Sequence, residues 1–271
     1  MNFLYLENYM RKLICGVLSA LCISTVFANN KGCYAGIKID KSVADAVKWY
    51  RNSAEQRALY HQVFNTALNY VTLNKDDKKP WGVVLDIDET TLDNSWYYKQ
   101  CGETTSSENE FSRYVVLPEK STALPGVKNF TCAIKKMGGY VTMLSNRDGS
   151  YAYDGKNVLT STVNNLKAQG VCFDQVVLAD RADAKNPSDK NPRFEAVQNG
   201  TCNTKLMVCS NVLPAHKVVA YFGDNIQDFP KLFQAKMISK SKDDEAYSTF
   251  ANGFFILPNP MYGSWQDNKF M

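Results

Sequence analysis

The sequence predicts an α/β fold in which a mainly parallel sheet is flanked by helices. Short apolar runs alternate along the chain with segments whose apolar residues recur at helical spacing, and strands that alternate with helices form parallel sheets. Polar clusters directly follow three of the apolar runs: Asp86 with Asp88, Ser145-Asn146-Arg147, and Asp224 with Asp228. Because ligands of such sheets bind beyond the carboxyl ends of the strands, we expect these clusters to meet at one site.

The first residues have the layout of a secretory signal peptide. Met10-Arg11-Lys12 is basic, residues 13–27 are almost wholly apolar or small, and Val26-Phe27-Ala28 places small residues at the −3 and −1 positions of a cleavage site. The apolar run is short for a membrane span; a retained anchor is the alternative. We therefore expect residues 1–28 to be a cleaved signal peptide of a periplasmic or secreted bacterial protein, and residues 29–271 to form a single domain.

The cysteines and the charge of the chain restrict the classes of function that the protein can have. An even number of cysteines in an exported chain permits disulfides, and the pair Cys202–Cys209 is favoured because it brackets a short segment that could form a hairpin. The net charge of +4 and the lack of a Lys/Arg cluster argue against a nucleic-acid polymer or an anionic membrane surface as partner. The sequence contains no Cys/His cluster of the kind that binds zinc. The cysteines that follow the signal peptide, whose full pairing the sequence leaves open, are Cys33, Cys101, Cys132, Cys172, Cys202 and Cys209.

The N-terminal part of the domain is expected to begin with a long helix. Apolar residues recur at helical spacing from Ser42, a predicted N-cap, to Val71. A charged loop over residues 74–80 ends this helix, and the first strand covers residues 81–87. Residues 96–123 are polar and are predicted to be irregular, with an exposed loop over residues 104–110.

The remaining elements follow from the same signals of period and turn residues. We expect helices over residues 125–137, 157–169, 192–197 and 228–234, and strands over residues 140–144, 176–178, 218–222 and 253–257.

Asp86 and Asp88, at the end of the first strand, are the most informative residues. Alternate residues of a strand share a face, so both carboxylates can point to one site; a solvated turn is the alternative. Four like charges in one crevice require a cation, and oxygen ligands in an exported protein favour Mg²⁺. Asp86 and Asp224 are the leading predicted ligands, with Asp88 contributing its backbone carbonyl and Asp228 holding a ligand water.

The same residues permit phosphoryl transfer. A carboxylate can act as nucleophile and form an aspartyl-phosphate, a role we assign to Asp86. Asp88 is placed to protonate the leaving oxygen and then to activate water. The pair then needs opposed pKa values, with Asp86 ionised and Asp88 transiently protonated, and we hypothesise that the site works best below neutral pH.

The phosphoryl oxygens need hydrogen-bond donors and a positive charge. Ser145 can supply a hydroxyl, and its neighbour Asn146 a backbone N–H. Lys190 precedes a predicted helix start and is our choice for the cation, with Lys185 as the competing candidate.

These motifs in combination resemble the haloacid dehalogenase (HAD) superfamily. They are Asp86-Ile-Asp88-Glu-Thr-Thr, Ser145-Asn146-Arg147, Lys190 with Arg193, and Gly223-Asp224-Asn225-Ile-Gln-Asp228-Phe229. Residues 49–60, 93–95 and 257–265 are similar more narrowly to the class C (subfamily IIIB) acid phosphatases, related to the lipoprotein e(P4) 5′-nucleotidase family. The resemblance covers about residues 35–270.

The resemblance implies a Rossmann-like, HAD-like domain with an N-terminal helical segment and a small cap insertion, with cap elements from about residues 35–80 and 96–123. It implies the roles given above for Asp86, Asp88, Ser145 and Lys190, Mg²⁺ as cofactor, and is compatible with a homodimer. Two features depart from the family. No convincing small residue precedes Cys15 or Cys22 for lipid attachment, and residues 200–215 look longer than the family pattern, which predicts a surface insertion.

The resemblance also implies an aromatic substrate pocket, for which Trp96, Tyr97, Tyr98, Tyr262 and Trp265 are candidates. Stacking on such rings tolerates different bases. We therefore predict a Mg²⁺-dependent acid phosphatase that hydrolyses phosphomonoesters, both aryl phosphates and nucleoside 5′-monophosphates, through an aspartyl-phosphate. A phosphotransferase with the same intermediate and a non-catalytic nucleotide-binding or uptake protein are the alternatives.

Overall fold

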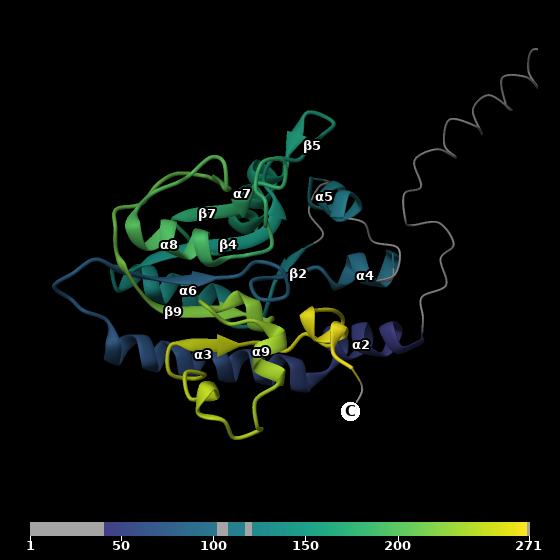
Figure 1. Ribbon diagram of the computed structural model, residues 1–271, viewed down its shortest axis with the longest axis horizontal. Coiled ribbons are helices and arrows are strands. Elements are labelled where there is room, and N and C mark those ends of the chain that lie inside the picture. The colour runs from purple at the N-terminus through teal and green to yellow at the C-terminus, as the bar shows by residue number, and fades with distance from the viewer. Residues whose placement is uncertain (1–40, 102–107, 117–120, 270–271) are drawn as a thin grey trace, which may run out of the picture. The chain divides into compact units, whose positions relative to one another are not determined.

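A six-stranded sheet forms the centre of the computed structural model, which describes residues 41–101, 108–116 and 121–269 (Figure 1). The strands, in their order across the sheet, are β10 Phe254–Ile256, β9 Lys217–Gly223, β1 Trp81–Leu85, β4 Tyr140–Asp148, β7 Gln175–Ala179 and β8 Met207–Cys209. All neighbours pair in parallel except β7 and β8. The predicted α/β fold with a mainly parallel sheet is confirmed.

Strand β1 lies inside the sheet, between β9 and β4, and all five of its residues are buried. The chain continues from β1 to β4 and β7 on one side and returns to β9 and β10 on the other. The strand order therefore reverses at β1, and ligands of such sheets bind at the reversal point. This topology places the residues that follow β1 at the middle of the ligand edge.

The helices connect and cover the strands. Their bounds are α2 Lys41–Asn52, α3 Ala54–Asn74, α4 Ser95–Cys101, α5 Glu108–Val116, α6 Val127–Lys136, α7 Val158–Ala168, α8 Asn191–Asn199 and α9 Gln234–Ile238. Short elements complete the described chain: β2 Leu92–Asp93, β3 Thr122–Ala123, β5 Ala152–Tyr153, β6 Lys156–Asn157 and the 3₁₀ helices Ile226–Asp228, Glu245–Tyr247 and Ser264–Asp267.

The long helix predicted over residues 42–71 is wrong in one respect, because the structure divides it at Ser53. This residue has extended backbone angles, and its hydroxyl accepts a hydrogen bond from the Gln56 N–H at 3.0 Å, so it caps α3. Helix α2 begins at Lys41 and therefore includes Ser42, the predicted cap. Apolar spacing continues across the break and hides it in the sequence.

Two further predictions are corrected. Residues 96–123 are not irregular throughout, because they contain α4 and α5; the Asp93 carboxylate accepts the Ser95 N–H at 2.8 Å, where α4 starts. The helix predicted over residues 228–234 is replaced by the 3₁₀ turn ending at Asp228 and by α9. Phe229 is extended because it precedes Pro230, and the residue before a proline avoids helical angles.

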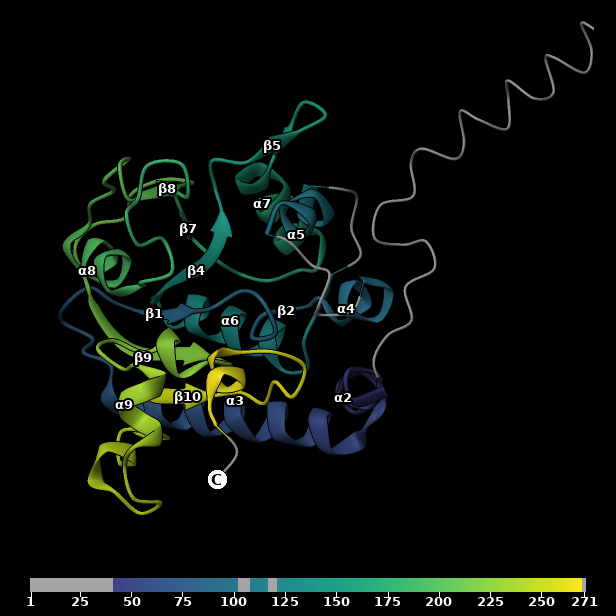
Figure 2. The same ribbon diagram turned by 45° about the vertical axis from the view of Figure 1, so that its right-hand side comes forward.

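Aromatic rings join the sheet to the helices on one face, where α3 contacts β9 and β10 and α6 contacts β4 (Figure 2). Phe64 of α3 lies 5.3 Å from Phe130 of α6 and 5.7 Å from Phe222 of β9, between ring centroids. Phe222 stacks in turn on Phe255 of β10 at 5.1 Å. The N-terminal helix α3 thus belongs to the layer that covers the sheet.

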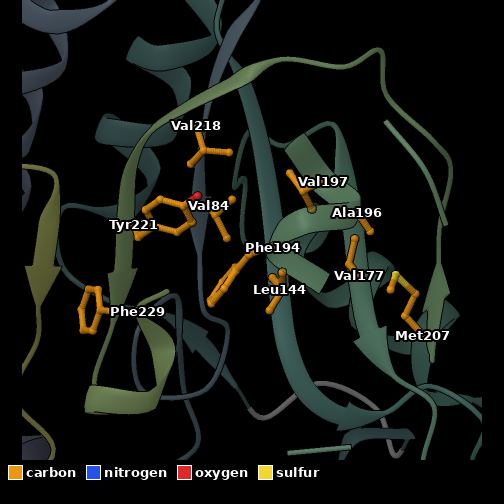
Figure 3. Close-up of a cluster of buried hydrophobic side chains, with 10 residues drawn as sticks. All are labelled: Val84, Leu144, Val177, Phe194, Ala196, Val197, Met207, Val218, Tyr221 and Phe229. Atoms are coloured by element: carbon orange, nitrogen blue, oxygen red, sulfur yellow. The ribbon is translucent and has the colours of Figure 1, made fainter. Parts of the chain in front are cut away.

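Helix α8 packs on the opposite face, since Tyr221 of its cluster is adjacent to Phe222 in β9 and adjacent strand residues point to opposite faces. Figure 3 shows this buried cluster, which contains Val84, Leu144, Val177, Phe194, Ala196, Val197, Met207, Val218, Tyr221 and Phe229. Full burial of one such large side chain contributes about 1.5–3 kcal/mol. The cluster fixes α8, and with it the start of α8, against the strands that carry the polar residues.

Two disulfides connect the described part of the chain. Cys202–Cys209 is the pair that the sequence favoured, and it ties the segment before β8 to the end of that strand. Cys132–Cys172 joins α6 to the segment before β7. Cys33, the side chain of Cys101 and the predicted signal peptide lie outside the described residues. Nowhere in the ranges that the structure describes is a helix both long and apolar enough to cross a membrane.

Candidate active site

The loop after β1 presents Asp86 and Asp88. It turns tightly, because the backbone N–H groups of Thr91 and Leu92 both donate to the carbonyl of Ile87, at 2.9 and 2.7 Å. The Thr91 hydroxyl also donates to the carbonyl of Asp86 at 2.6 Å. These bonds close the loop at the carboxyl end of a buried strand and fix the positions of both aspartates.

Glu89 lies within this loop in the left-handed backbone region, with φ of 55°. Such a conformation costs a residue other than glycine about 1–3 kcal/mol and persists only where neighbours hold it. Two buried phenols do so: Tyr50 of α2 and Tyr60 of α3 both donate to the Glu89 carbonyl, and their hydroxyls lie 2.6 Å apart. The N-terminal helices therefore support the aspartate loop from behind.

Two carboxylates contact one lysine at the centre of the site, and a third lies close to both of them. Lys190 precedes α8 and is buried, and its ammonium contacts Asp86 directly and Asp228 at 2.7 Å. Asp224 follows β9, and oxygens of Asp86, Asp224 and Asp228 lie within 4.8 Å of one another. Carboxylate oxygens at this spacing fit a hard divalent cation. The carboxylate of Asp88 is not part of this group, so its backbone carbonyl remains the predicted ligand.

Two of these carboxylates, those of Asp86 and Asp224, have raised pKa values. Burial raises the pKa of Asp86 well above its usual range; Lys190 opposes this shift, whereas Asp228 and Asp224 reinforce it. Burial and the charge of Asp228 raise the pKa of Asp224 to about 7. Burial acts to lower the pKa of Lys190, but Asp228 and Asp86 together raise it above its usual value. The site thus keeps its lysine charged among carboxylates that favour a proton or a metal ion.

In protein freed of divalent cations, the free energy of unfolding is expected to fall as pH rises from 3.8 to about 7. In this range folded Asp224 holds a proton that the unfolded chain has released, so the free energy of unfolding falls with pH. Asp86 acts in the same direction, and Lys190 titrates only at higher pH. Thermal unfolding of chelator-treated protein at several pH values measures the effect. Asp224→Asn, which cannot titrate, should show a smaller slope; an equal slope would contradict the assignment.

Asp88 is held by an arginine. Arg147 donates to both of its carboxylate oxygens, at 2.8 Å from Nη2 and at 3.0 and 3.2 Å from Nε. Ser145 donates to the same carboxylate at 3.0 Å and Asn94 at 2.7 Å. Thr162 of α7 anchors the guanidinium from behind at 2.9 Å. This network orients Asp88 beside Asp86 without placing it among the candidate metal ligands.

A second buried arginine joins two of the polar segments. Arg193 of α8 donates to the carbonyl of Ser145 and to the side chain of Asn146, and at 2.9 Å to the carbonyl of Pro187. Burial lowers its pKa to about 10, so it stays charged at neutral pH. Through Arg193, the end of β4 and the start of α8 keep a fixed separation, and that separation positions Ser145 relative to Lys190.

The aromatic candidates divide into two groups. Tyr98 and Tyr262 line the cavity and stack on each other, with ring centroids 4.5 Å apart and an interplanar angle of 25°. Trp96 lies instead beside the cations of Arg51 and Lys99, and Tyr97 is fully buried against other rings. Neither lines the cavity, and nor does Trp265. The structure thus brings Tyr262, but not Trp96 or Tyr97, to the polar site.

A cavity of about 320 Å³ opens over these groups, large enough for a small ligand. The residues that line it are Asp86, Asp88, Tyr98, Phe111, Ser112, Ser145, Asn146, Arg147, Asp148, Arg181, Lys190, Asp224, Asn225, Gln227, Asp228 and Tyr262. Apart from the aromatic residues Trp96, Tyr97 and Trp265, the residues chosen from the sequence for catalysis, phosphate, substrate or metal are included. Lys185, the competing candidate for the cation, is exposed and does not line the cavity.

Sequence reasoning assigned no function to several of the residues found here. Arg147 had a usable signal, since it lies two residues after Ser145 and alternate strand residues share a face. Glu89 and Asn259 had none: the amide of Asn259 donates to Asp224 at 2.8 Å from a segment 35 residues further along the chain. Phe111 and Ser112 were not identified because the sequence analysis did not predict helix α5.

Comparison with known proteins gives one family match and similar solved structures. The sequence matches the family model described as HAD superfamily, subfamily IIIB (Acid phosphatase), over residues 25–265. The fold is similar to that of the class C acid phosphatase from Bacillus anthracis, with 26% identity, a TM-score of 0.63, and coverage of 83% of this chain and 86% of that chain. The structure of the Bacillus anthracis class C enzyme with tungstate bound gives 27% identity, a TM-score of 0.64 and the same coverage.

Proposed function

The chain belongs to the acid phosphatases of HAD superfamily subfamily IIIB and is a phosphomonoesterase, and from this premise we propose that it is Mg²⁺-dependent and acts through an aspartyl-phosphate on Asp86. One observation carries the proposal: Asp86 shares a buried cluster with Lys190, Asp224 and Asp228. Such a cluster can hold a divalent cation and a phosphoryl group together. The family membership sets aside the non-catalytic alternative.

In the first proposed step, a carboxylate oxygen of Asp86 attacks the phosphorus of the ester. The bond between phosphorus and the ester oxygen breaks, and Asp88 gives its proton to that oxygen, so an alcohol or phenol leaves. In the second step, water attacks the phosphorus of the aspartyl-phosphate, and Asp88 takes the proton of the water. The bond between phosphorus and the Asp86 oxygen breaks, phosphate leaves, and both aspartates return to their starting states.

The remaining groups stabilise charge on the phosphoryl oxygens. Lys190 supplies a positive charge, and Ser145 and Asn146 supply donors from the carboxyl-terminal half of β4. When bound by Asp86, Asp224 and Asp228, Mg²⁺ supplies further neutralisation of that charge. The Bacillus anthracis enzyme binds tungstate, an oxyanion that, like phosphate, is tetrahedral, which supports an oxyanion site in this family.

We propose aryl phosphates and nucleoside 5′-monophosphates as substrates, because the stacked rings of Tyr98 and Tyr262 line the same cavity as Asp86. We also propose a periplasmic or secreted location after cleavage at Ala28. The two disulfides, Cys132–Cys172 and Cys202–Cys209, support it, since disulfides persist in oxidising compartments.

Phosphate release by the purified protein tests the proposal. We expect release from p-nitrophenyl phosphate and from a nucleoside 5′-monophosphate with Mg²⁺ present, and loss of release with a chelator that Mg²⁺ restores. Trapping with acid during turnover should recover a phosphorylated protein that Asp86→Asn does not give. Full activity in the chelator would contradict the metal requirement, and well-folded protein without release from either ester would contradict the substrate proposal.

A further inference from the structure

Glu89 is a fully buried carboxyl group that the proposed reaction does not use. Its two oxygens have different partners. One accepts the backbone N–H of Asn94 at 2.7 Å, within the same loop. The other accepts the hydroxyl of Tyr262, which is 173 residues further along the chain. The side chain therefore connects the aspartate loop to the C-terminal segment.

The C-terminal segment depends on such connections for its position. Residues 257–263 lie outside helices and strands. Two side-chain hydrogen bonds attach this segment to the site: Asn259 donates to Asp224 at 2.8 Å, and Tyr262 donates to Glu89. The first holds the backbone near Tyr262, since the Asn259 side chain also accepts the N–H of Met261 at 3.0 Å. The second fixes the far end of the Tyr262 ring.

The position of this ring determines one wall of the cavity. Tyr262 stacks on Tyr98, and both rings line the space above Asp86 and Asp88. An aromatic leaving group gains by stacking only if the ring that receives it keeps a fixed orientation, because ordering a mobile side chain opposes binding. A small aliphatic leaving group gains nothing from the wall.

We propose that Glu89 is a positioning residue that sets leaving-group preference: its carboxyl group holds the hydroxyl of Tyr262, so that the ring favours phosphomonoesters of nucleosides and phenols over aliphatic ones. This inference rests on the proposed function and deepens it. It assigns no part of the bond-breaking chemistry to Glu89.

The geometry allows a conservative replacement to be distinguished from a disruptive one. In Glu89→Gln, the amide oxygen can accept the Asn94 N–H while the amide N–H₂ donates to the phenol oxygen of Tyr262, so the connection persists with one bond reversed. Glu89→Leu removes both bonds. Tyr262→Phe keeps the ring and removes only its hydroxyl. The first change should preserve the preference, and the other two should reduce it.

The test is the ratio of kcat/KM for p-nitrophenyl phosphate, or for a nucleoside 5′-monophosphate, to kcat/KM for glycerol phosphate. Tyr262→Phe and Glu89→Leu should lower this ratio about tenfold, as expected for the loss of one stacking contact. The change should lie mainly in KM for the ring-bearing esters. Glu89→Gln should keep the ratio near that of the wild type.

Tyr247→Phe is the matched control. The Tyr247 hydroxyl donates to the carbonyl of Met237 at 2.9 Å, and Tyr247 does not line the cavity. This variant also loses one phenol hydrogen bond, so a general effect of such a loss would appear in it. A lowered ratio in Tyr262→Phe but not in Tyr247→Phe would support the inference.

An unchanged ratio in Tyr262→Phe, or an equal loss for all three esters, would overturn it. If Glu89→Leu does not fold, Tyr262→Phe still decides, because it leaves Glu89 and the ring in place. Failure of the proposed function is separate: a folded wild-type protein that releases no phosphate from any ester would overturn the function and this inference together. If the wild type is active and Tyr262→Phe leaves the ratio unchanged, the inference alone is overturned.

Discussion

Asp86→Asn is expected to abolish phosphate release while the protein stays folded. An amide at this position has the shape of the carboxylate but is not a nucleophile, so no aspartyl-phosphate forms. We expect kcat to fall by at least about 10⁴-fold, as when other enzymes lose their nucleophile. Phosphate release from p-nitrophenyl phosphate in the presence of Mg²⁺ measures the change.

The fold should survive because the replacement relieves electrostatic repulsion. Asp86 is buried next to Asp228 and the half-buried Asp224, and Lys190 keeps Asp228 as a partner in the variant. Thermal unfolding should therefore show no large loss of stability. Asp174→Asn is a suitable control, since Asp174 is paired with Lys135 at 2.5 Å and is not among the residues that line the cavity. Release by Asp86→Asn above a few per cent of the wild type would contradict the nucleophile assignment.

The location of the site follows from the sequence because a simple rule governs it. Apolar runs are buried as strands, and the polar residues directly after them must then lie at the strand ends. Asp86, Ser145 and Asp224 were each found in this way, and the structure brings all three to one cavity. The lysine was harder, since Lys185 and Lys190 both precede α8, and only the packing of that helix brings Lys190 inward.

The aromatic residues show why other parts of the site could not be predicted from the sequence. Trp96, Tyr97 and Tyr98 are consecutive, and the sequence analysis expected an irregular chain there. The structure forms α4, in which successive residues point about 100° apart. Consecutive rings on a helix cannot share one face, so only Tyr98 reaches the cavity. The helical phase that selects it is not visible in the composition of the segment.

The contacts of Glu89 and Arg147 illustrate a second limit. Each depends on a partner from a distant part of the chain: Tyr262 for Glu89, and Asp88 for Arg147. Spacing within one segment indicates which residues share a face, but it does not indicate which segments meet. The same limit applies to the phenols of Tyr50 and Tyr60, which support the aspartate loop. Their helices precede β1 in the chain, and spacing does not indicate that they pack behind it.

Lys190→Met is expected to have the second largest effect, and it acts in opposite directions on catalysis and on metal binding. The lysine is the buried cation in contact with Asp86, where it would neutralise charge on the phosphoryl group. Loss of one such group lowers kcat/KM by about 10²–10³-fold. Methionine preserves most of the side-chain volume, so packing around α8 should persist.

The same change should strengthen Mg²⁺ binding, because the cluster of Asp86, Asp224 and Asp228 then carries no internal positive charge. Without metal, the variant should be less stable than the wild type by about 3–5 kcal/mol, since breaking a buried ion pair leaves uncompensated carboxylates. Saturating Mg²⁺ should restore most of that loss. Calorimetric titration with Mg²⁺ and thermal unfolding with and without it measure both effects.

Lys185→Met provides the comparison, since that lysine is exposed and outside the cavity. It should leave kcat/KM, Mg²⁺ affinity and stability unchanged. Normal kinetics in Lys190→Met would move the phosphate-binding role to Lys185. A variant at Lys190 that binds Mg²⁺ more tightly yet hydrolyses esters far more slowly would separate the two functions of the acidic cluster: metal binding needs only the carboxylates, whereas phosphoryl transfer also needs the charge that Lys190 brings to Asp86.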